Sequence, residues 1–178
     1  MYYFANDYSE GAHKKVLEAL IKTNYIQCAG YGLDGFSAKA SSKIKKLINC
    51  EDVDIHYVSA FLRSHEAIIC PGSGHINVHE AGSIEASGHK IIQTKGVNGK
   101  ITAQEILDVL KVHTDEHMVK PKLVFITDAT EIGTIYTKEE LISIHDVCKK
   151  HGLYLYLDGA RLANALCAQD NDLTLEDI

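Results

Sequence analysis

The ten residues from Leu155 to Asn164 combine residue types that could do chemistry on a bound small molecule. An apolar run with strand character ends at Asp158, turns at Gly159 and places Arg161 three residues after the acid. At the carboxyl end of a buried parallel strand, this pattern aims a carboxylate and a guanidinium into the crevice where open α/β sheets bind ligands. The carboxylate can hold a protonated heterocyclic nitrogen, and the guanidinium can bind a substrate carboxylate. Taken alone, the motif is equally compatible with an aspartate that caps a helix after a strand.

A second stretch with chemical potential runs from Gly72 to Gly82 and contains His75, His79 and Glu80. Small residues before His75 leave space, and an imidazole there could stack on a flat ring or move a proton. A solvated helix cap is the simpler interpretation of this histidine. The two histidines and the glutamate are also zinc-ligand types, but no further ligand follows this H-x-x-x-H-E pattern at a recognisable spacing, so we expect no metal site.

Length, composition and charge indicate an ordinary globular protein. The chain has 178 residues, 46% of them hydrophobic and 24% charged, which suits one domain or slightly more. The net charge is −6 and the lysines are scattered, so no nucleic-acid partner is expected. No apolar run is as long as a membrane span, and the N-terminus does not resemble a secretory signal, which together predict a cytoplasmic protein. The cysteines are odd in number and form no C-x-x-C pair, which favours reduced thiols: Cys28, Cys50, Cys70, Cys148 and Cys167.

Strand-like and helix-like segments alternate along the chain, which predicts an α/β fold with a mostly parallel sheet flanked by helices. We expect strands at residues 53–59, 66–70, 89–93, 122–127 and 153–158. A first helix is expected to follow a cap at Ser9 and to place Ala12, Val16, Leu17, Leu20 and Ile21 on one face. A glycine-rich loop at residues 29–36 precedes a second expected helix at residues 38–49.

Capping boxes mark the start of later helices. Thr102 has Glu105 three residues on, and Thr137 has Glu140, so each pair can satisfy free backbone amides of a first helical turn. The second of these helices ends at Gly152 and lies between the strands expected at 122–127 and 153–158, which completes a β-α-β unit. A third pair, Thr174 and Asp177, predicts the start of one more helix.

One junction between expected strands is unusually short. Only six residues, 60–65, separate the strand that ends at Ser59 from the strand that starts near Glu66. A parallel crossover needs about a dozen residues or more, so either these two strands are antiparallel or a crossover helix is missing. Because residues 60–65 contain no Gly, Asn or Pro and resemble the last turn of a helix, the missing helix is favoured.

Five segments occur in the order expected of low-specificity threonine aldolases: 6–11, 30–32, 74–80, 130–134 and 157–162. On these residues the chain resembles the β-eliminating-lyase group of pyridoxal-phosphate enzymes, which have the aspartate-aminotransferase-like fold. The resemblance runs over essentially all 178 residues but over only about the first half of a usual family chain. It implies that residues 1–178 are a partial large domain whose cofactor is pyridoxal 5′-phosphate. The implied reaction cleaves threonine or a related β-hydroxy amino acid to glycine and an aldehyde.

The resemblance also implies roles for individual residues. Asp158 would pair with the protonated pyridine nitrogen, Arg161 would bind the substrate carboxylate, and His75 would stack on the ring and help deprotonate the substrate hydroxyl. Other matches fall in the N-terminal part: Tyr31 resembles a tyrosine that reaches the phosphate of a neighbouring subunit, while Asn6 and Asp7 lie in a stretch near the substrate. The resemblance also implies a homodimer or homotetramer for a complete chain.

Two family features have no match in this sequence. The turn and helix that hold the cofactor phosphate should follow residues 53–59, but Ser59 joins directly to Ala60. The lysine that bonds covalently to the cofactor lies well after the Asp158–Arg161 motif in the family, and no lysine of this chain matches it. We therefore expect a domain that is incomplete at the 59/60 junction and at its C-terminus, and that is inactive by itself.

Two alternatives stay open at this stage. The chain could be a non-catalytic truncated remnant or isoform that associates with a full-length paralogue. It could instead be another fold relative, such as a cysteine desulfurase or an aminotransferase. Asp158 fits those enzymes equally well, but the segment 74–80 and the Arg161 motif favour the aldolase group.

Overall fold

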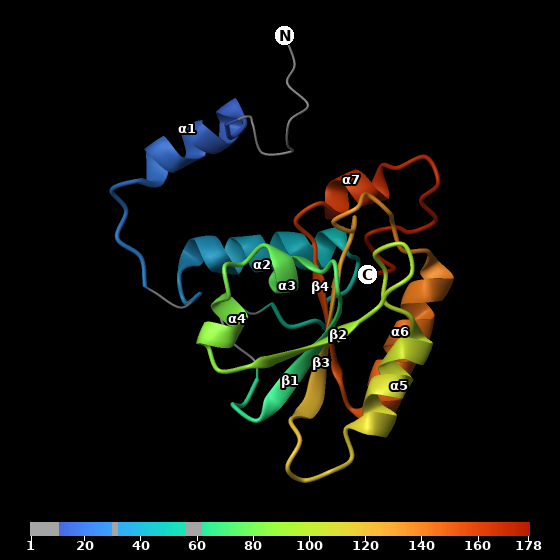
Figure 1. The fold of residues 1–178 in the computed structure, drawn as a ribbon. Helices are drawn as coiled ribbons and strands as arrows, with labels where there is room; N and C mark the ends of the chain where they lie inside the picture. The colour runs from blue at the N-terminus through green and yellow to red at the C-terminus, as the bar shows by residue number, and fades with distance from the viewer. Residues whose placement is uncertain (1–10, 30–31, 56–61) are drawn as a thin grey trace.

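The structure is a computed structural model that describes residues 11–29, 32–55 and 62–178. Within these residues, a four-stranded sheet has the strand order β2-β1-β3-β4, and all three strand pairs are parallel (Figure 1). The strands are β1 (Glu66–Pro71), β2 (Lys90–Thr94), β3 (Lys120–Thr127) and β4 (Tyr154–Asp158). The helices are α1 (Lys14–Thr23), α2 (Gly35–Leu47), α3 (His75–Val78), α4 (Ser83–Ala86), α5 (Ala103–Val112), α6 (Lys138–His151) and α7 (Leu162–Leu166).

Alternate side chains of the central strands enter two hydrophobic clusters on opposite faces of the sheet, as the pleat of a strand requires. On one face, Ile69, Val124 and Ile126 contact the buried sides of α5 and α6, which lie together against the sheet (Figure 1). On the other face, Ile68 and Phe125 belong to a second cluster that partly buried residues of the α3–α4 region complete. Because both faces are covered, residues 67–70 of β1 and 123–126 of β3 are continuous apolar runs.

The predicted β-α-β unit is confirmed. The strand β3, the helix α6 and the strand β4 follow one another, and Thr127 of β3 pairs in register with Asp158 of β4. Both predicted capping boxes at Thr102 and Thr137 are formed, and Gly152 ends α6 in the left-handed conformation, with φ 65°. Local sequence signals, namely capping residues and a helix-ending glycine, therefore predict the elements from α5 to β4 well.

The first two helices begin at other residues than the sequence predicts. α1 starts at Lys14, where the imidazole Nδ1 of His13 accepts the backbone N–H of Lys15, so Ala12 lies before the helix. α2 starts at Gly35 rather than near residue 38, because the Asp34 carboxylate accepts backbone N–H groups of the first turn. The predicted cap at Ser9 lies outside the described residues.

Two further expectations concern the ends of elements. Residues 53–55 are not in a strand, and the remainder of the strand expected at 53–59, together with the 59/60 junction, lies outside the described residues. The expectation of a helix after Thr174 is wrong, since residues 175–176 form a turn. The Thr174 backbone N–H donates to Asp177 Oδ2 at 2.8 Å, and Asp177 Oδ1 pairs with Lys138 Nζ at 2.6 Å. These contacts close the turn without the costly nucleation of a helix.

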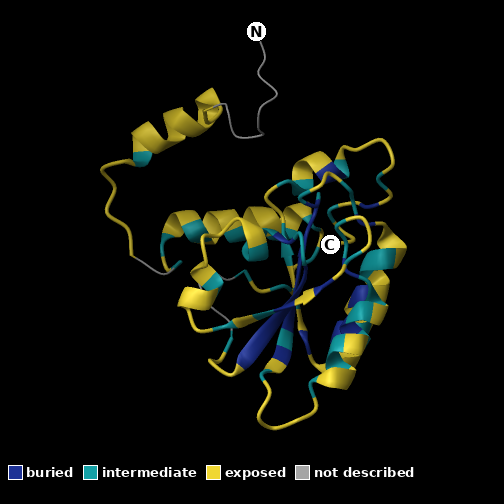
Figure 2. Cartoon of the chain, viewed as in Figure 1, coloured by how far each residue is buried: buried dark blue, intermediate teal, exposed yellow. Residues whose placement is uncertain are grey.

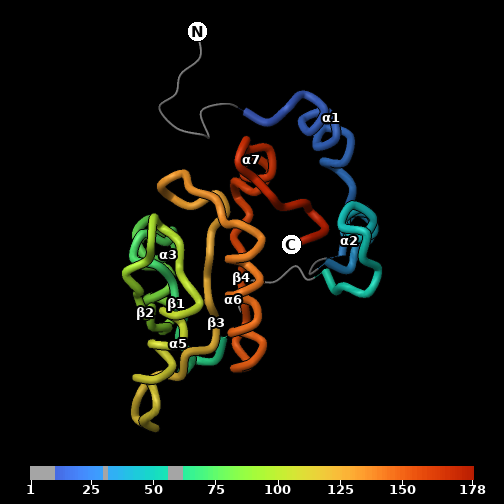
Figure 3. Tube along the Cα trace, turned by 90° about the vertical axis from the view of Figure 1, so that its right-hand side faces the viewer, coloured from blue at the N-terminus to red at the C-terminus, as the bar shows by residue number. Residues whose placement is uncertain are grey.

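α1 buries no residue and projects from the sheet (Figures 1 and 2), and α2 likewise buries no residue. Viewed at 90° to Figure 1, α1 and α2 lie beyond the β4 side of the sheet, whereas β2 forms the opposite edge (Figure 3). No helix in residues 11–29, 32–55 and 62–178 is long and apolar enough to cross a membrane.

Candidate active site

A cavity of about 260 Å³ lies at the carboxyl ends of β1, β3 and β4. It contains all three residues to which the sequence assigns the central chemistry, His75, Asp158 and Arg161, although they are far apart in the chain. The residues that line it are His75, Glu80, Thr127, Ala129, Glu131, Asp158, Ala160 and Arg161. This location is where open α/β sheets bind their ligands.

The turn after β1 sets the position of His75. The Gly74 backbone N–H donates to the Pro71 carbonyl at 2.8 Å, and a Cβ on Gly74 would come within 3.0 Å of that carbonyl oxygen. A larger residue here would have to displace that carbonyl, so glycine suits this tight turn. The Gly72 N–H donates to Thr94 O at 2.9 Å, which ties the turn to the end of β2. His75 then begins α3.

The His75 imidazole has two side-chain neighbours within its own segment. Its Nδ1 lies 2.7 Å from Glu80 Oε1, and its ring centroid lies 5.3 Å from that of His79 at an interplanar angle of 45°. The side chains of His75 and Glu80 are 32% and 42% exposed, so solvent reaches both. One ring nitrogen is thus engaged by a carboxylate at the wall of the cavity.

Asp158 and Arg161 are set by the turn that follows β4. Asp158 Oδ1 accepts the Ala160 backbone N–H at 3.0 Å, and its carbonyl accepts the N–H of Asp128 at 3.3 Å. Arg161 Nη1 lies 3.2 Å from Glu131 Oε1, and the Glu131 side chain is only 11% exposed. The guanidinium is therefore oriented by a nearly buried carboxylate from the loop after β3.

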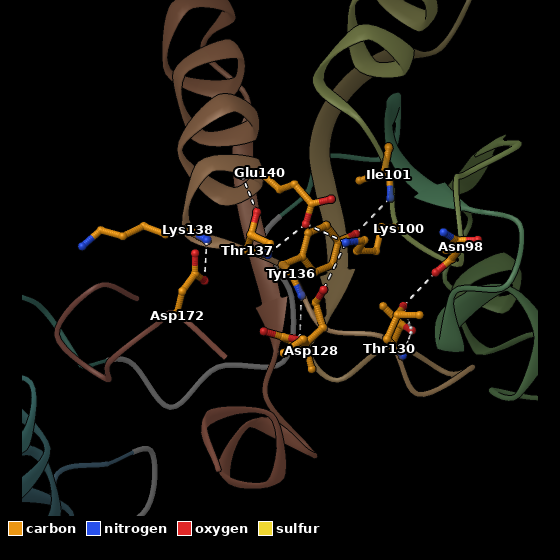
Figure 4. A network of polar contacts seen from close by, with 12 residues as sticks. Asn98, Lys100, Ile101, Asp128, Thr130, Tyr136, Thr137, Lys138, Glu140 and Asp172 are labelled. Carbon is orange, nitrogen blue, oxygen red and sulfur yellow. Dashed lines mark hydrogen bonds and ion pairs between the residues drawn. The ribbon is translucent and has the colours of Figure 1, made fainter. Parts of the chain in front are cut away.

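That loop is supported from behind by a buried polar network (Figure 4). Asp128 Oδ1 accepts the Tyr136 backbone N–H at 3.3 Å, and the Tyr136 hydroxyl accepts the Ile101 N–H at 2.9 Å. The Thr134 hydroxyl donates to Asn98 O at 2.7 Å. The network joins the cavity loop to the segment between β2 and α5, and so holds Ala129 and Glu131 at the cavity wall.

Sequence reasoning found some cavity residues and missed the roles of others. The sequence indicates Glu80 only as a zinc-ligand type, and Glu131 only as part of a family motif. Among the described residues, no group of three or more metal-ligand side chains converges. The signals for these two glutamates were their spacing, five residues after His75 and four after the end of β3. Tyr31, Asn6 and Asp7 lie outside the described residues.

Comparison with known proteins identifies the family. A profile of the beta-eliminating lyase family matches residues 52–174. The chain belongs to the beta-eliminating lyase family. A low-specificity L-threonine aldolase of a Pseudomonas species is 33% identical over 93% of this chain and 51% of its own length. A second, from Candida albicans, is 30% identical over 57% of this chain and 28% of its own. The chain thus spans about half the length of the Pseudomonas relative.

Solved structures agree with this assignment. A threonine aldolase of Leishmania major matches with a TM-score of 0.87 and 47% identity, over 97% of this chain and 54% of the other. The fold is that of the aspartate-aminotransferase-like threonine aldolases, present here in part. Enzymes of this family depend on pyridoxal phosphate.

The cavity of this chain suits the ring of that cofactor better than its phosphate. It offers a carboxylate for a cationic ring nitrogen, an imidazole beside it and a guanidinium for a carboxylate partner. Among the described residues that line it, Arg161 is the single basic group besides His75, and it is already paired with Glu131. The described lining also contains no lysine.

Proposed function

We propose that this chain carries the ring-binding and substrate-binding part of a pyridoxal-phosphate-dependent aldolase. The substrate is threonine or a related β-hydroxy amino acid, and the products are glycine and an aldehyde. The observation that carries the proposal is the convergence of His75, Asp158 and Arg161 on one cavity at the carboxyl edge of the sheet. The similarity to threonine aldolases over almost the whole chain supports the reaction class.

Each of the three residues has a distinct role in this proposal. Asp158 holds the cationic ring nitrogen through Oδ2, since Oδ1 already accepts the Ala160 N–H. Arg161 binds the substrate carboxylate, with Glu131 setting the direction of its guanidinium. His75 accepts the proton of the substrate hydroxyl as the carbon–carbon bond breaks. When bound, pyridoxal phosphate supplies the electron sink for that cleavage.

The proposal predicts cofactor affinity without turnover for the 178-residue chain. Pyridoxine 5′-phosphate is the suitable probe, because it has the same ring and phosphate but no aldehyde to react with surface lysines. We expect the Asp158→Asn variant to bind it about ten-fold more weakly in equilibrium dialysis, since a charge-assisted hydrogen bond to the ring nitrogen is lost. The exposed Asp170→Asn variant is the matched control and should bind as the wild type does.

Turnover is tested separately with threonine and pyridoxal phosphate. No acetaldehyde should form above the rate given by free cofactor, because the described cavity lining contains no lysine to hold the cofactor covalently. Equal affinity of the wild type and Asp158→Asn for the probe would remove the assigned role of Asp158. Acetaldehyde formation by the pure chain would show that it is active by itself.

We also propose that the protein is cytoplasmic and forms a homodimer or homotetramer. Contiguous exposed apolar side chains commonly mark contact surfaces between proteins. α1 supports a second copy as the partner, because it buries nothing and exposes four large apolar side chains: Val16, Leu17, Leu20 and Ile21. Light scattering on the purified chain should therefore give a mass of at least two copies, and a monomer at all concentrations would contradict this proposal.

A further inference from the structure

The hydrogen bond between His75 and Glu80 specifies which nitrogen of the imidazole carries the proton. His75 Nδ1 lies 2.7 Å from Glu80 Oε1, which is a short distance for a nitrogen donor and an oxygen acceptor. A glutamate carboxylate is ionised at neutral pH and can only accept a hydrogen bond. Nδ1 must therefore be the donor and carry a proton. In the neutral ring this leaves Nε2 unprotonated, so that Nε2 can act as an acceptor.

The backbone around Glu80 is arranged to hold its carboxylate at this place. The His79 backbone N–H donates to the His75 carbonyl at 2.9 Å, which closes one helical turn and brings the next residue beside the imidazole. The Glu80 carbonyl in turn accepts the Ser83 N–H at 2.9 Å, at the start of α4. The position of Glu80 is thus fixed on both sides along the chain.

The His79 ring limits the imidazole on another side. Its centroid lies 5.3 Å from that of His75, and the two rings are inclined by 45°. His75 and Glu80 both line the cavity, whereas His79 is not among the residues that line it. The carboxylate and the second ring together restrict how far the His75 ring can turn.

We propose that Glu80 is a positioning residue that keeps His75 protonated on Nδ1, so that Nε2 can accept the proton of the substrate hydroxyl. The inference rests on the proposed function for the identity of the proton donor. The tautomer itself depends only on residues of this chain. The competing interpretation is a solvent-exposed pair of side chains, which would stabilise the turn slightly and leave the tautomer to solvent.

The tautomer can be read from the cofactor-free chain by long-range ¹H–¹⁵N correlation NMR of the histidine rings. The spectrum is recorded at about pH 8.5, about two units above the ordinary pKa of a histidine side chain. His75 is assigned by the loss of its signals in His75→Gln. We expect wild-type His75 to show a protonated Nδ1 and an unprotonated Nε2.

Other histidines of the same chain provide internal references for both tautomers. His89 Nδ1 and His113 Nδ1 lie 3.2 Å and 2.9 Å from backbone carbonyl oxygens, so both must donate from Nδ1. His13 Nδ1 accepts the backbone N–H of Lys15 at 3.2 Å and represents the opposite form. The signals of these three residues should not change when Glu80 is replaced.

The decisive comparison is between Glu80→Ala and Glu85→Ala. Removing the acceptor should shift His75 toward the form protonated on Nε2, with a change of about ten-fold in the ratio of the two tautomers. Glu85 is an exposed glutamate of the neighbouring helix α4 whose removal should leave the His75 ratio unchanged. Retained dispersion of the backbone amide spectrum shows that each variant is folded.

Two results would overturn the inference. One is a wild-type His75 protonated on Nε2, which needs no variant and so is informative even if Glu80→Ala does not fold. The other is a Glu80→Ala variant, folded, with the wild-type tautomer ratio. Neither result involves cofactor binding, so a failure of the Asp158 binding test would leave the assignment of Glu80 and the tautomer unaffected.

Discussion

Replacing Tyr136 with alanine is expected to lower the free energy of unfolding by about 3–5 kcal/mol, the cost of removing a large aromatic side chain from a packed core. The residue is 1% exposed and lies in the hydrophobic cluster between the sheet and the helices α5 and α6. Its hydroxyl also accepts the Ile101 N–H at 2.9 Å, so the alanine variant leaves a buried donor without its partner. Against a total of about 5–15 kcal/mol for a domain, this loss is severe.

Urea unfolding separates the two contributions of this side chain. Tyr136→Phe keeps the ring and loses only the hydroxyl, so it should cost about 1–3 kcal/mol. Tyr25→Ala is the control, since that ring is 93% exposed and its loss should change stability by less than about 0.5 kcal/mol. Equal urea midpoints for Tyr136→Ala and Tyr25→Ala would refute the structural role assigned here.

Tyr136 also connects the core to the cavity, which makes its loss relevant to function. Its backbone N–H donates to Asp128, the residue that precedes Ala129 at the cavity wall. A chain destabilised at Tyr136 should therefore lose the order of the loop that carries Glu131, the partner of Arg161. Core packing and substrate recognition depend on the same segment.

The elements that sequence predicted best are those whose signals are local. The capping boxes at Thr102 and Thr137 and the glycine that ends α6 act within one helical turn, so residue type and spacing suffice to predict them. The carboxylate and guanidinium after β4 were also predictable, because strand, turn and charge follow in immediate succession from residue 154 to 161.

The contacts that sequence did not predict depend on segments brought together by the fold. Glu131 and Arg161 are thirty residues apart, and only the parallel pairing of β3 with β4 brings their loops together. The start of α2 was missed for a different reason. Asp34 lies in a stretch whose glycines and aromatic residues indicate a loop, and its capping role is visible only from its bonds to Phe36 and Ser37.

Asp128 is expected to make the stability of this domain depend on pH in the direction opposite to that of a salt-bridged aspartate. Its side chain is buried, with the residue 1% exposed, and Oδ2 has no hydrogen-bond partner among the described residues. Burial raises the pKa of this carboxyl group, although the Tyr136 N–H and the charge of Lys100 act in the opposite direction. The folded chain therefore favours the protonated acid more than the unfolded chain does.

The sign of the effect follows from this shift. The stability that Asp128 contributes is fully present below its unfolded pKa, near 3.9, and is lost as pH rises through its raised folded pKa. Each pKa unit by which the folded value exceeds the unfolded value corresponds to about 1.4 kcal/mol of stability lost at neutral pH. Asp128→Asn removes the titration but keeps an oxygen that can accept the Tyr136 N–H. The variant should gain stability relative to the wild type as pH increases.

The measurement is the difference in unfolding free energy between wild type and Asp128→Asn, taken from urea titrations between about pH 4 and pH 8. Taking the difference cancels the titration of groups that do not interact with Asp128. Glu140 is not one of them, since its charge raises the pKa of Asp128. Asp170→Asn, at an exposed site, should give a difference that does not vary with pH. A pH-independent difference for Asp128→Asn as well would mean that this carboxyl group ionises in the folded chain as easily as in water. The Tyr136 N–H and the charge of Lys100 would then offset the effect of burial on its pKa in full.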